Sequence, residues 1–252
     1  MAEKTHEAVF LIFRGTPENG EYKEYRIQVV DGMVVLDAMM EIQAKFVSDL
    51  GIRCNCGAGK CGSCSAEING VPRLMCKTRL SDLPEGQPVK VGPLKSFPGI
   101  KDLVTDVSWN YEVNKTMTPF TPHQDTEWRM QQFEVDRIQE HRKCIECFLC
   151  QDTCHVIREH DKKKEYCGPR FLVRLASLAM HPLDAADRMA FIKEKAGIGL
   201  CNVTHCCSDV CPEKIRITDN AIIPLKERIA DRYYDPVLTL IRRIFGKRKS
   251  NI

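Results

Sequence analysis

Short apolar runs separated by turn-forming residues fill roughly the first hundred positions of the chain, a pattern typical of β-strands. Residues 8–13 and 24–30 predict two strands joined across a segment rich in Gly, Pro and Asn. Residues 65–68 and 73–75 flank Asn69-Gly70, a dipeptide that favours a tight turn, so they predict a hairpin.

One helix is predicted between these strands, at residues 34–46, because apolar side chains recur there at a helical spacing. The run at 89–91 predicts a last short strand. Strands on both sides of a single helix amount to a small α+β unit. The recurring apolar positions of the helix are Val35, Met39, Ile42 and Phe46.

Beyond this unit, prolines, threonines and isolated aromatic residues dominate positions 93–122, which indicates a connection between two units. The remainder has the periodicity of helices, and Pro224 must kink or start the helix in which it lies. We therefore place a first domain at residues 1–110 and a second at residues 111–252. The predicted helices are 127–141, one opened by Gly168-Pro169, 184–195, 219–233, and one opened by Asp235-Pro236.

Composition excludes several classes of protein. The chain has 252 residues, enough for two domains, and its formal net charge of +3 is too small to indicate nucleic-acid binding. No apolar run approaches the ~18–20 residues that a membrane-spanning helix requires. Basic residues gather near the C-terminus, which is typical of a solvated tail, with contact to anionic lipid headgroups as the alternative. They are Arg242, Arg243, Lys247, Arg248 and Lys249.

Fourteen cysteines change the picture. They gather in three short runs, where mutual disulfides would constrain little, and the N-terminus lacks the apolar core of a signal peptide. Glu3 and Glu7 argue against a mitochondrial presequence, which is poor in acidic residues. We therefore expect metal-bound thiolates in the cytosol of a prokaryote rather than a disulfide scaffold.

The first cysteine run has the spacing of a plant-type [2Fe–2S] site, C-x4-C-x2-C with a more distant fourth cysteine. Glycines within it let the loop wrap closely and leave backbone N–H groups free to point at the cluster sulfurs. A zinc ribbon is the alternative, but it favours two C-x2-C pairs about 15–20 residues apart. Cys54 breaks the spacing and is taken as a bystander. The predicted ligands are Cys56, Cys61, Cys64 and Cys76.

The second and third runs have the spacing of a bacterial two-cluster ferredoxin, C-x2-C-x2-C-x3-C-P. In the second run His155 replaces the proline, and in the third run Thr204 stands where the second cysteine belongs. In such ferredoxins the first three cysteines of a run bind one cluster and the fourth binds the other. The runs place cysteines at Cys144, Cys147, Cys150 and Cys154, and at Cys201, Cys207 and Cys211 before Pro212.

This rule gives four thiolates to one cluster and three to the other, because Thr204 cannot replace the missing sulfur. Cys206 adjoins Cys207, but the register of the run favours Cys207 as the ligand. Cys167 and Cys206 are interpreted as small buried hydrophobic residues. A [4Fe–4S] cluster is predicted at Cys144, Cys147, Cys150 and Cys211, and a [3Fe–4S] cluster at Cys154, Cys201 and Cys207.

Together these motifs resemble one family closely, the iron–sulfur subunits of succinate dehydrogenase and fumarate reductase. The resemblance covers nearly the whole chain and implies its fold class, α+β, with a β-grasp plant-type ferredoxin domain followed by an all-α helical ferredoxin domain. It rests on Arg53-Cys-Asn-Cys56, Cys61-Gly-Ser-Cys64, Leu74-Met-Cys76, Lys143-Cys-Ile-Glu-Cys147, Gly168-Pro169 and Val210-Cys-Pro212.

The resemblance also implies partners and an activity. A flavoprotein subunit with FAD performs the dehydrogenation, and membrane-anchor subunits, with or without haem, hold the complex at the cytoplasmic face of the prokaryotic cell membrane. Electrons pass between FAD and a membrane quinone through the three clusters in order. This chain then moves single electrons and holds no catalytic acid, base or nucleophile. A three-iron cluster accepts an electron at a relatively high potential and suits the quinone end.

The chain departs from many ubiquinone-linked members at two positions. Those members carry a proline and a tryptophan pair after the position of Cys154, where this chain has His155, and often a histidine where it has Asn202. The departure indicates a different quinone, such as menaquinone, or a different anchor arrangement. Succinate oxidation is the first prediction, fumarate reduction the alternative, and a zinc-stapled interaction module a remote third.

Overall fold

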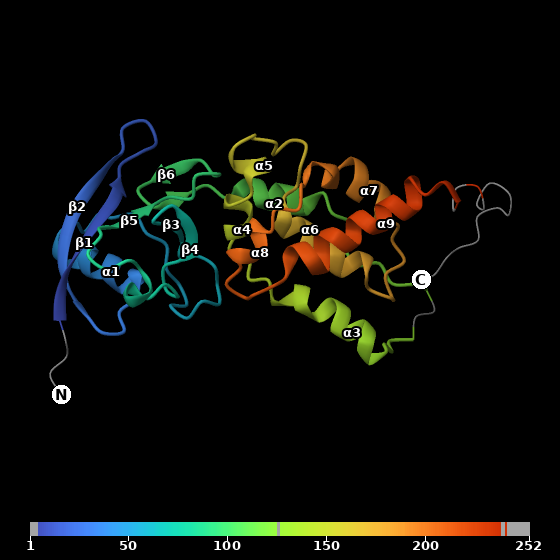
Figure 1. Ribbon diagram of the computed structural model, residues 1–252, viewed down its shortest axis with the longest axis horizontal. Helices are drawn as coiled ribbons and strands as arrows, with labels where there is room; N and C mark the ends of the chain where they lie inside the picture. The colour runs from blue at the N-terminus through green and yellow to red at the C-terminus, as the bar shows by residue number, and fades with distance from the viewer. Residues whose placement is uncertain (1–4, 125–126, 238–239, 241–252) are drawn as a thin grey trace.

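The computed structural model describes residues 5–124, 127–237 and 240. A sheet unit and a helical unit lie side by side along the long axis of the molecule (Figure 1). The short helices that carry cysteines, α4 (Leu149–Asp152) and α8 (Cys206–Asp209), lie in the middle, where the two units meet.

The sheet unit holds a five-stranded mixed sheet in the order β2–β1–β5–β3–β4. The long strands β1 and β2 pair antiparallel, and β5 returns parallel to β1 at the centre of the sheet. The hairpin of β3 and β4 closes the other edge across Asn69-Gly70. This is the predicted β-grasp arrangement, and the predicted strands are confirmed. Their bounds are Thr5–Arg14 (β1), Glu21–Val30 (β2), Ser65–Ile68 (β3), Val71–Leu74 (β4) and Val89–Gly92 (β5).

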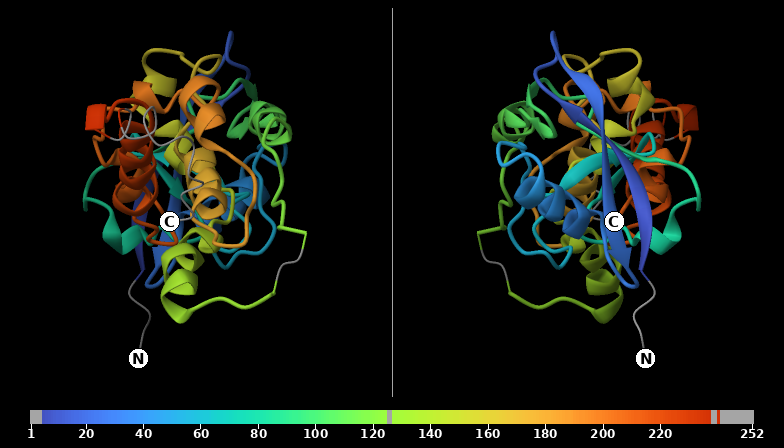
Figure 2. Two further views of the ribbon diagram at one scale, coloured as in Figure 1. Left: turned by 90° about the vertical axis from the view of Figure 1, so that its right-hand side faces the viewer. Right: turned by 90° about the vertical axis from the view of Figure 1, so that its left-hand side faces the viewer.

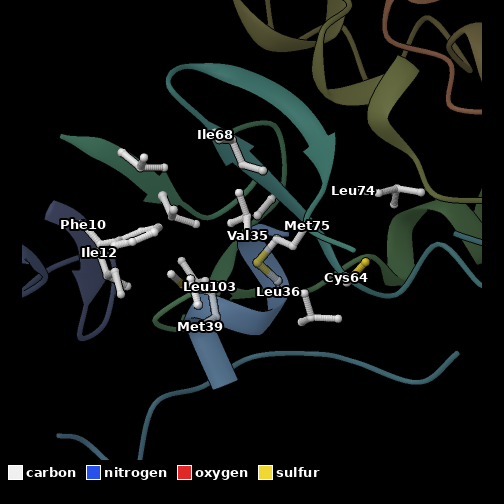
Figure 3. Packing of buried hydrophobic residues seen from close by; sticks show 14 of the residues in the cluster. Phe10, Ile12, Val35, Leu36, Met39, Cys64, Ile68, Leu74, Met75 and Leu103 are labelled. Atoms are coloured by element: carbon white, nitrogen blue, oxygen red, sulfur yellow. The ribbon is translucent and has the colours of Figure 1, made fainter. Parts of the chain in front are cut away.

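The predicted helix is α1 (Val35–Lys45), whose apolar face packs on the sheet. Met39 and Ile42 are fully buried, whereas Phe46 is 54% exposed because the helix ends before it. Cys64 belongs to the same core as Leu36 and Met75 (Figure 3), so the first cysteine loop is anchored directly on the hydrophobic core.

The predicted connection at 93–122 is in part regularly structured, contrary to expectation. It contains a small hairpin, β6 (Gly99–Lys101) with β7 (Val104–Thr105), and the helix α2 (Ser108–Lys115). Asp102 fastens the hairpin, because its buried carboxylate accepts hydrogen bonds from the backbone N–H groups of Gly15 at 2.6 Å and Gly51 at 2.7 Å. These elements are too short to produce a recognisable period in the sequence. The boundary at residue 110 lies within α2 and stays a prediction.

The helical unit is built around α6 (Pro169–Ala179), which buries Phe171, Leu172 and Leu175. The predicted start at Gly168-Pro169 is confirmed: Gly168 has a φ of +86°, and Pro169 occupies the first turn. Pro224 likewise lies in the first turn of a helix, α9 (Ile223–Tyr233). The short π-helix η4 (Ile217–Ile222) leads directly into α9, so the proline starts the α-helix.

Two predicted helices are shorter than expected. The helix predicted at 127–141 is α3 (Gln132–Gln139) followed by the 3₁₀ turn η2 (Glu140–Lys143), and it lies at the edge of the molecule (Figure 2). Trp128 and Phe133 are each 70% exposed, so part of the apolar pattern that predicted it is not buried. The helix predicted at 184–195 is α7 (Met189–Glu194).

The residues before α7 serve another purpose. Arg188 donates to the carboxylate of Asp184 and to the backbone carbonyls of Thr118 and Pro119, which ties the connection onto the helical unit. The remaining short helices are η1 (Leu80–Asp82), α5 (His155–Arg158) and η3 (Ile198–Leu200).

The last predicted helix, opened by Asp235-Pro236, lies almost entirely outside the described residues, and the basic cluster from Arg242 to Lys249 lies wholly outside them. No helix within the described ranges is long and apolar enough to cross a membrane.

A cluster of buried polar side chains joins the sheet unit to the helical unit. Glu67 on β3 pairs with Arg158 at 2.6 Å, between Glu67 Oε1 and Arg158 Nη1. Asp152, also buried, accepts a hydrogen bond from the backbone N–H of Ser96 at 2.8 Å. Burial raises the pKa of Asp152 to about 7, and the charge of Glu67 adds to the rise against the opposing effects of Ser96 and Arg158.

Replacing Asp152 with Asn should weaken the pH dependence of stability. Between about pH 4 and pH 7 the folded chain holds a proton on Asp152 that the unfolded chain, with an ordinary carboxyl pKa of 3.8, does not. This group therefore makes the folded state less stable as the pH rises, by up to about 1.4 kcal/mol per pH unit. The Asp152→Asn variant keeps an acceptor for Ser96 and cannot titrate. Its free energy of unfolding should therefore fall less steeply than that of the parent as the pH rises.

Denaturant unfolding at about pH 5.5 and about pH 7.5 measures the difference. Asp231→Asn, which changes an exposed carboxylate, is the matched control and should keep the slope of the parent. A slope that is the same in all three proteins would contradict the role given to Asp152.

Candidate iron–sulfur centres

The first cysteine loop follows α1 and is held between it and β3. Cys56 Sγ accepts hydrogen bonds from the backbone N–H groups of Ala58 at 3.4 Å and Lys60 at 3.2 Å. Cys64 Sγ and Cys76 Sγ are 3.3 Å apart, because Cys76 directly follows the hairpin that begins at Ser65. The loop and the hairpin therefore bring the cysteines of the predicted [2Fe–2S] site together, and backbone N–H groups point at the sulfur of Cys56.

The thiols of this loop differ in acidity. The hydroxyl of Ser63, 3.1 Å from Cys61 Sγ, is the main cause that lowers the pKa of Cys61 to about 6. Burial raises the pKa of Cys64 to about 12. Because iron binds the thiolate, the buried cysteines must lose their protons when a cluster is assembled.

The four cysteines predicted to bind [4Fe–4S] line a single pocket with otherwise mostly apolar walls. Burial raises the pKa of Cys147 to about 12, and the neighbouring charges of Cys144 and Cys211 add to it. Cys150 is shifted in the same direction for the same reasons. The structure thus brings Cys211 from the third run to three cysteines of the second, as the sequence predicted.

Cys154, Cys201 and Cys207 form the third group. Burial raises the pKa of Cys154 to about 11, with further contributions from the charges of Cys206 and Cys201. Burial likewise raises the pKa of Cys207 to about 12. The hydroxyl of Thr218 lies 3.5 Å from Cys207 Sγ and opposes this rise, because it hydrogen-bonds the sulfur.

The second and third runs share one backbone conformation. Left-handed φ angles occur at Glu146 (55°) and Phe148 (60°), two and four positions after Cys144. They recur at Val203 (59°) and His205 (62°), at the same offsets from Cys201. Thr204 therefore occupies the place in its loop that Cys147 occupies in the other, and the loop keeps the conformation although the sulfur is missing.

The three groups of cysteines lie next to one another. Gly62, between Cys61 and Cys64, approaches Cys147 so closely that an added Cβ would lie 2.7 Å from Cys147 Cα. Ser65 Oγ donates to the carbonyl of Cys147 at 2.9 Å. On the other side, the charge of Cys207 is among those that raise the pKa of Cys150. The order in space is first group, second group, third group.

Three cysteines remain outside the predicted sites. Cys54 is exposed. Cys167 is buried beside Cys154, and its thiol is 3.6 Å from the carbonyl of Gly168, which fits a small buried residue. Cys206 is only half-buried, 3.4 Å from the hydroxyl of Thr204, and it affects Cys154 electrostatically, which the sequence did not indicate.

Two polar side chains around the third group, Thr218 and Tyr166, were missed in the sequence. Thr218 was missed because it is remote in the sequence and reaches Cys207 only through η4. Tyr166 was missed because a lone tyrosine before Gly168 carries no motif. The two departures from the ubiquinone-linked pattern meet in space, since His155 Nε2 and Asn202 Oδ1 are 2.8 Å apart.

Comparison with known proteins matches this organisation. Residues 9–112 match the family model "2Fe-2S iron-sulfur cluster binding domain", and residues 140–215 match "4Fe-4S dicluster domain". A solved structure of the Mycobacterium smegmatis Sdh1 complex contains a chain that is 54% identical, with a TM-score of 0.90 over 93% of this chain and 100% of that one. The fumarate reductase iron-sulfur subunit of Mycobacterium tuberculosis is 30% identical over 77% of this chain and 80% of its own length. The chain belongs to the succinate dehydrogenase and fumarate reductase iron–sulfur subunit family.

Some relatives are much longer than this chain. A fumarate reductase (CoM/CoB) protein of Methanothermobacter marburgensis is 32% identical over 84% of this chain, but the chain spans only 42% of that protein. Family membership confirms the two predicted kinds of ferredoxin domain. It favours iron–sulfur ligation of the cysteines over the zinc module and the disulfide scaffold.

Replacing Gly62 with Ala should cost more stability than the same change at Gly57. Both glycines have left-handed φ angles, +69° and +62°, so each variant pays about 1–2 kcal/mol of backbone strain. Nothing lies within 4 Å of a Cβ at Gly57, whereas one at Gly62 meets the backbone of Cys147. Unfolding free energies of both variants of the iron-loaded chain measure the difference. Equal losses at the two positions would show that the contact with Cys147 does not support the junction.

Proposed function

We propose that this chain relays single electrons between the FAD of a flavoprotein subunit and a membrane quinone, as the iron–sulfur subunit of a succinate dehydrogenase. The observation that carries the proposal is the spatial order of the three cysteine groups, with Gly62 against Cys147 on one side and Cys150 beside Cys207 on the other. An electron carrier needs closely spaced redox centres, and the succession of three neighbouring cysteine groups supports such a relay.

The ligand assignment belongs to the same proposal. Iron–sulfur clusters, when bound, supply one-electron chemistry over roughly −700 to +450 mV. The residues of this chain hold the clusters, donate hydrogen bonds to their sulfurs and, where the groups are buried, keep water away. We assign [2Fe–2S] to Cys56, Cys61, Cys64 and Cys76, [4Fe–4S] to Cys144, Cys147, Cys150 and Cys211, and [3Fe–4S] to Cys154, Cys201 and Cys207.

The domain division at 1–110 and 111–252 accompanies this assignment. It is supported by two clusters of buried side chains, one around the sheet and one around α6, and the first cluster also takes in Phe148 and Leu149 of the second domain at the junction. The division places the [2Fe–2S] group in the first domain and both other groups in the second. The third cluster, with one thiolate fewer, then lies at the end of the relay and passes electrons to quinone.

The partners we propose are a flavoprotein subunit and membrane-anchor subunits, with or without haem, at the cytoplasmic face of a prokaryotic cell membrane. The contact of His155 with Asn202 supports a quinone site unlike that of ubiquinone-linked members, because both departures lie at the third group. We propose menaquinone as the acceptor. Relatives named for both directions support succinate oxidation and fumarate reduction alike, and we propose succinate oxidation first.

Iron analysis and EPR of the intact complex test the proposal. Anaerobically purified complex should contain about nine irons in this chain, and its oxidised form should show the EPR signal of a three-iron cluster. Succinate should reduce the three-iron cluster and so remove its EPR signal. A menaquinone analogue should reoxidise the cluster and restore the signal. A low iron content without cluster signals would overturn the assignment, and a complex that used only ubiquinone would overturn the choice of menaquinone.

Replacing Thr204 with Cys should convert the third cluster. Because the loop has the conformation of the 144–150 loop, a sulfur at this position takes the place that Cys147 has there. The Thr204→Cys variant should therefore gain about one iron per chain and lose the three-iron EPR signal. Thr204→Ser, which adds no sulfur, is the control and should keep both. An unchanged iron content in Thr204→Cys would contradict the equivalence of the two loops.

A further inference from the structure

Tyr166 is a buried side chain whose hydroxyl has no protein partner. It is 1% exposed, and among the described residues no hydrogen-bonding group reaches its Oη. A buried hydroxyl without a partner is unfavourable, and such groups in native proteins usually await a water, an ion or a ligand.

The hydroxyl lies among the cysteines assigned to the third cluster. Burial raises the pKa of Tyr166 well above its usual value, and the charges of Cys201 and Cys154 are the next largest causes. Cys207 also contributes, so all three proposed ligands act on this one group. Tyr166 also belongs to the same cluster of buried side chains as Cys154 and Cys207.

The backbone holds Tyr166 in this position. Its N–H bonds to the carbonyl of Lys162 at 2.9 Å, and the next N–H, of Cys167, bonds to the carbonyl of Ala196 at 3.1 Å. Gly197 packs against the same segment so closely that an added Cβ would lie 1.8 Å from the carbonyl oxygen of Glu165. The backbone on both sides of Tyr166 is thus held in place, and the side chain is buried.

We propose that Tyr166 donates a hydrogen bond to a sulfur of the third cluster and thereby raises the reduction potential of that cluster. The inference rests on the proposed function, since it requires a cluster at Cys154, Cys201 and Cys207. In the one-electron step the oxidised [3Fe–4S]⁺ core becomes [3Fe–4S]⁰, and the tyrosyl proton stays on its oxygen. The reduced form carries one more negative charge, so a donor stabilises it more than the oxidised form.

In this role Tyr166 adjusts the reduction potential of the last electron acceptor of the chain. Among the residues that line the four-iron pocket, whose walls are mostly apolar, the charged donor is Arg170, and its guanidinium pairs with Glu146. A raised potential at the third cluster favours electron flow away from the four-iron cluster and towards quinone.

The Tyr166→Phe variant of the intact complex provides the test, because it removes only the hydroxyl. An EPR-monitored redox titration should show a midpoint potential for the three-iron cluster that is lower by about 59 mV, which corresponds to a tenfold weaker electron affinity. The midpoints of the other two clusters should not move. After exchange into D₂O, the parent should show an exchangeable deuteron coupled to the three-iron cluster, and the variant should have lost it.

Tyr234→Phe is the matched control, since it removes a hydroxyl from a side chain that is 67% exposed, and it should leave every midpoint unchanged. An unchanged three-iron midpoint in Tyr166→Phe would overturn the inference, as would an equal shift of the four-iron midpoint. Absence of the three-iron signal from the parent itself would instead overturn the proposed function, so the two failures are distinguishable.

Discussion

The contact between Gly62 and the backbone of Cys147 is the constraint on which the arrangement of the two units depends. The first cysteine loop approaches the second so closely at this point that there is no room for a side chain between the two backbones. The hydrogen bond from Ser65 to Cys147 and the ion pair of Glu67 with Arg158 fix the same approach from β3. The sheet unit is thereby docked through its cysteine loop, so the separation of the first and second cysteine groups is set by backbone contact.

Within the helical unit, the two cysteine runs are interdependent. Each run contributes its last cysteine to the group of the other, Cys211 to the second group and Cys154 to the third. Neither group can be completed unless α4 and α8 are both in place, and these short helices have little intrinsic stability. The proposed clusters therefore act as cross-links of the helical unit, and the proton loss that their assembly requires couples folding to iron binding.

The sequence predicted what is local and periodic. The strands, α1, the turn at Asn69-Gly70 and the helix opened by Pro169 follow from short-range patterns, and Cys144, Cys147, Cys150 and Cys211, grouped by their spacing, line one pocket. The hairpin fastened by Asp102 and the role of Arg188 before α7 could not be predicted, because each depends on partners far away in the chain. Tyr166 and Thr218 were missed for the same reason, since neither belongs to a motif.

The environment of the third group differs from that of the second in a consistent direction. It has one thiolate fewer, because Thr204 stands in a loop that otherwise repeats the conformation around Cys147. It also has hydroxyl groups close by, Thr218 beside Cys207 and Tyr166 among all three cysteines. Hydrogen-bond donors close to a bound cluster favour its reduced form. In the proposed relay, the missing sulfur sets the type of the third cluster and the buried tyrosine raises its potential, so both suit this group to the final position.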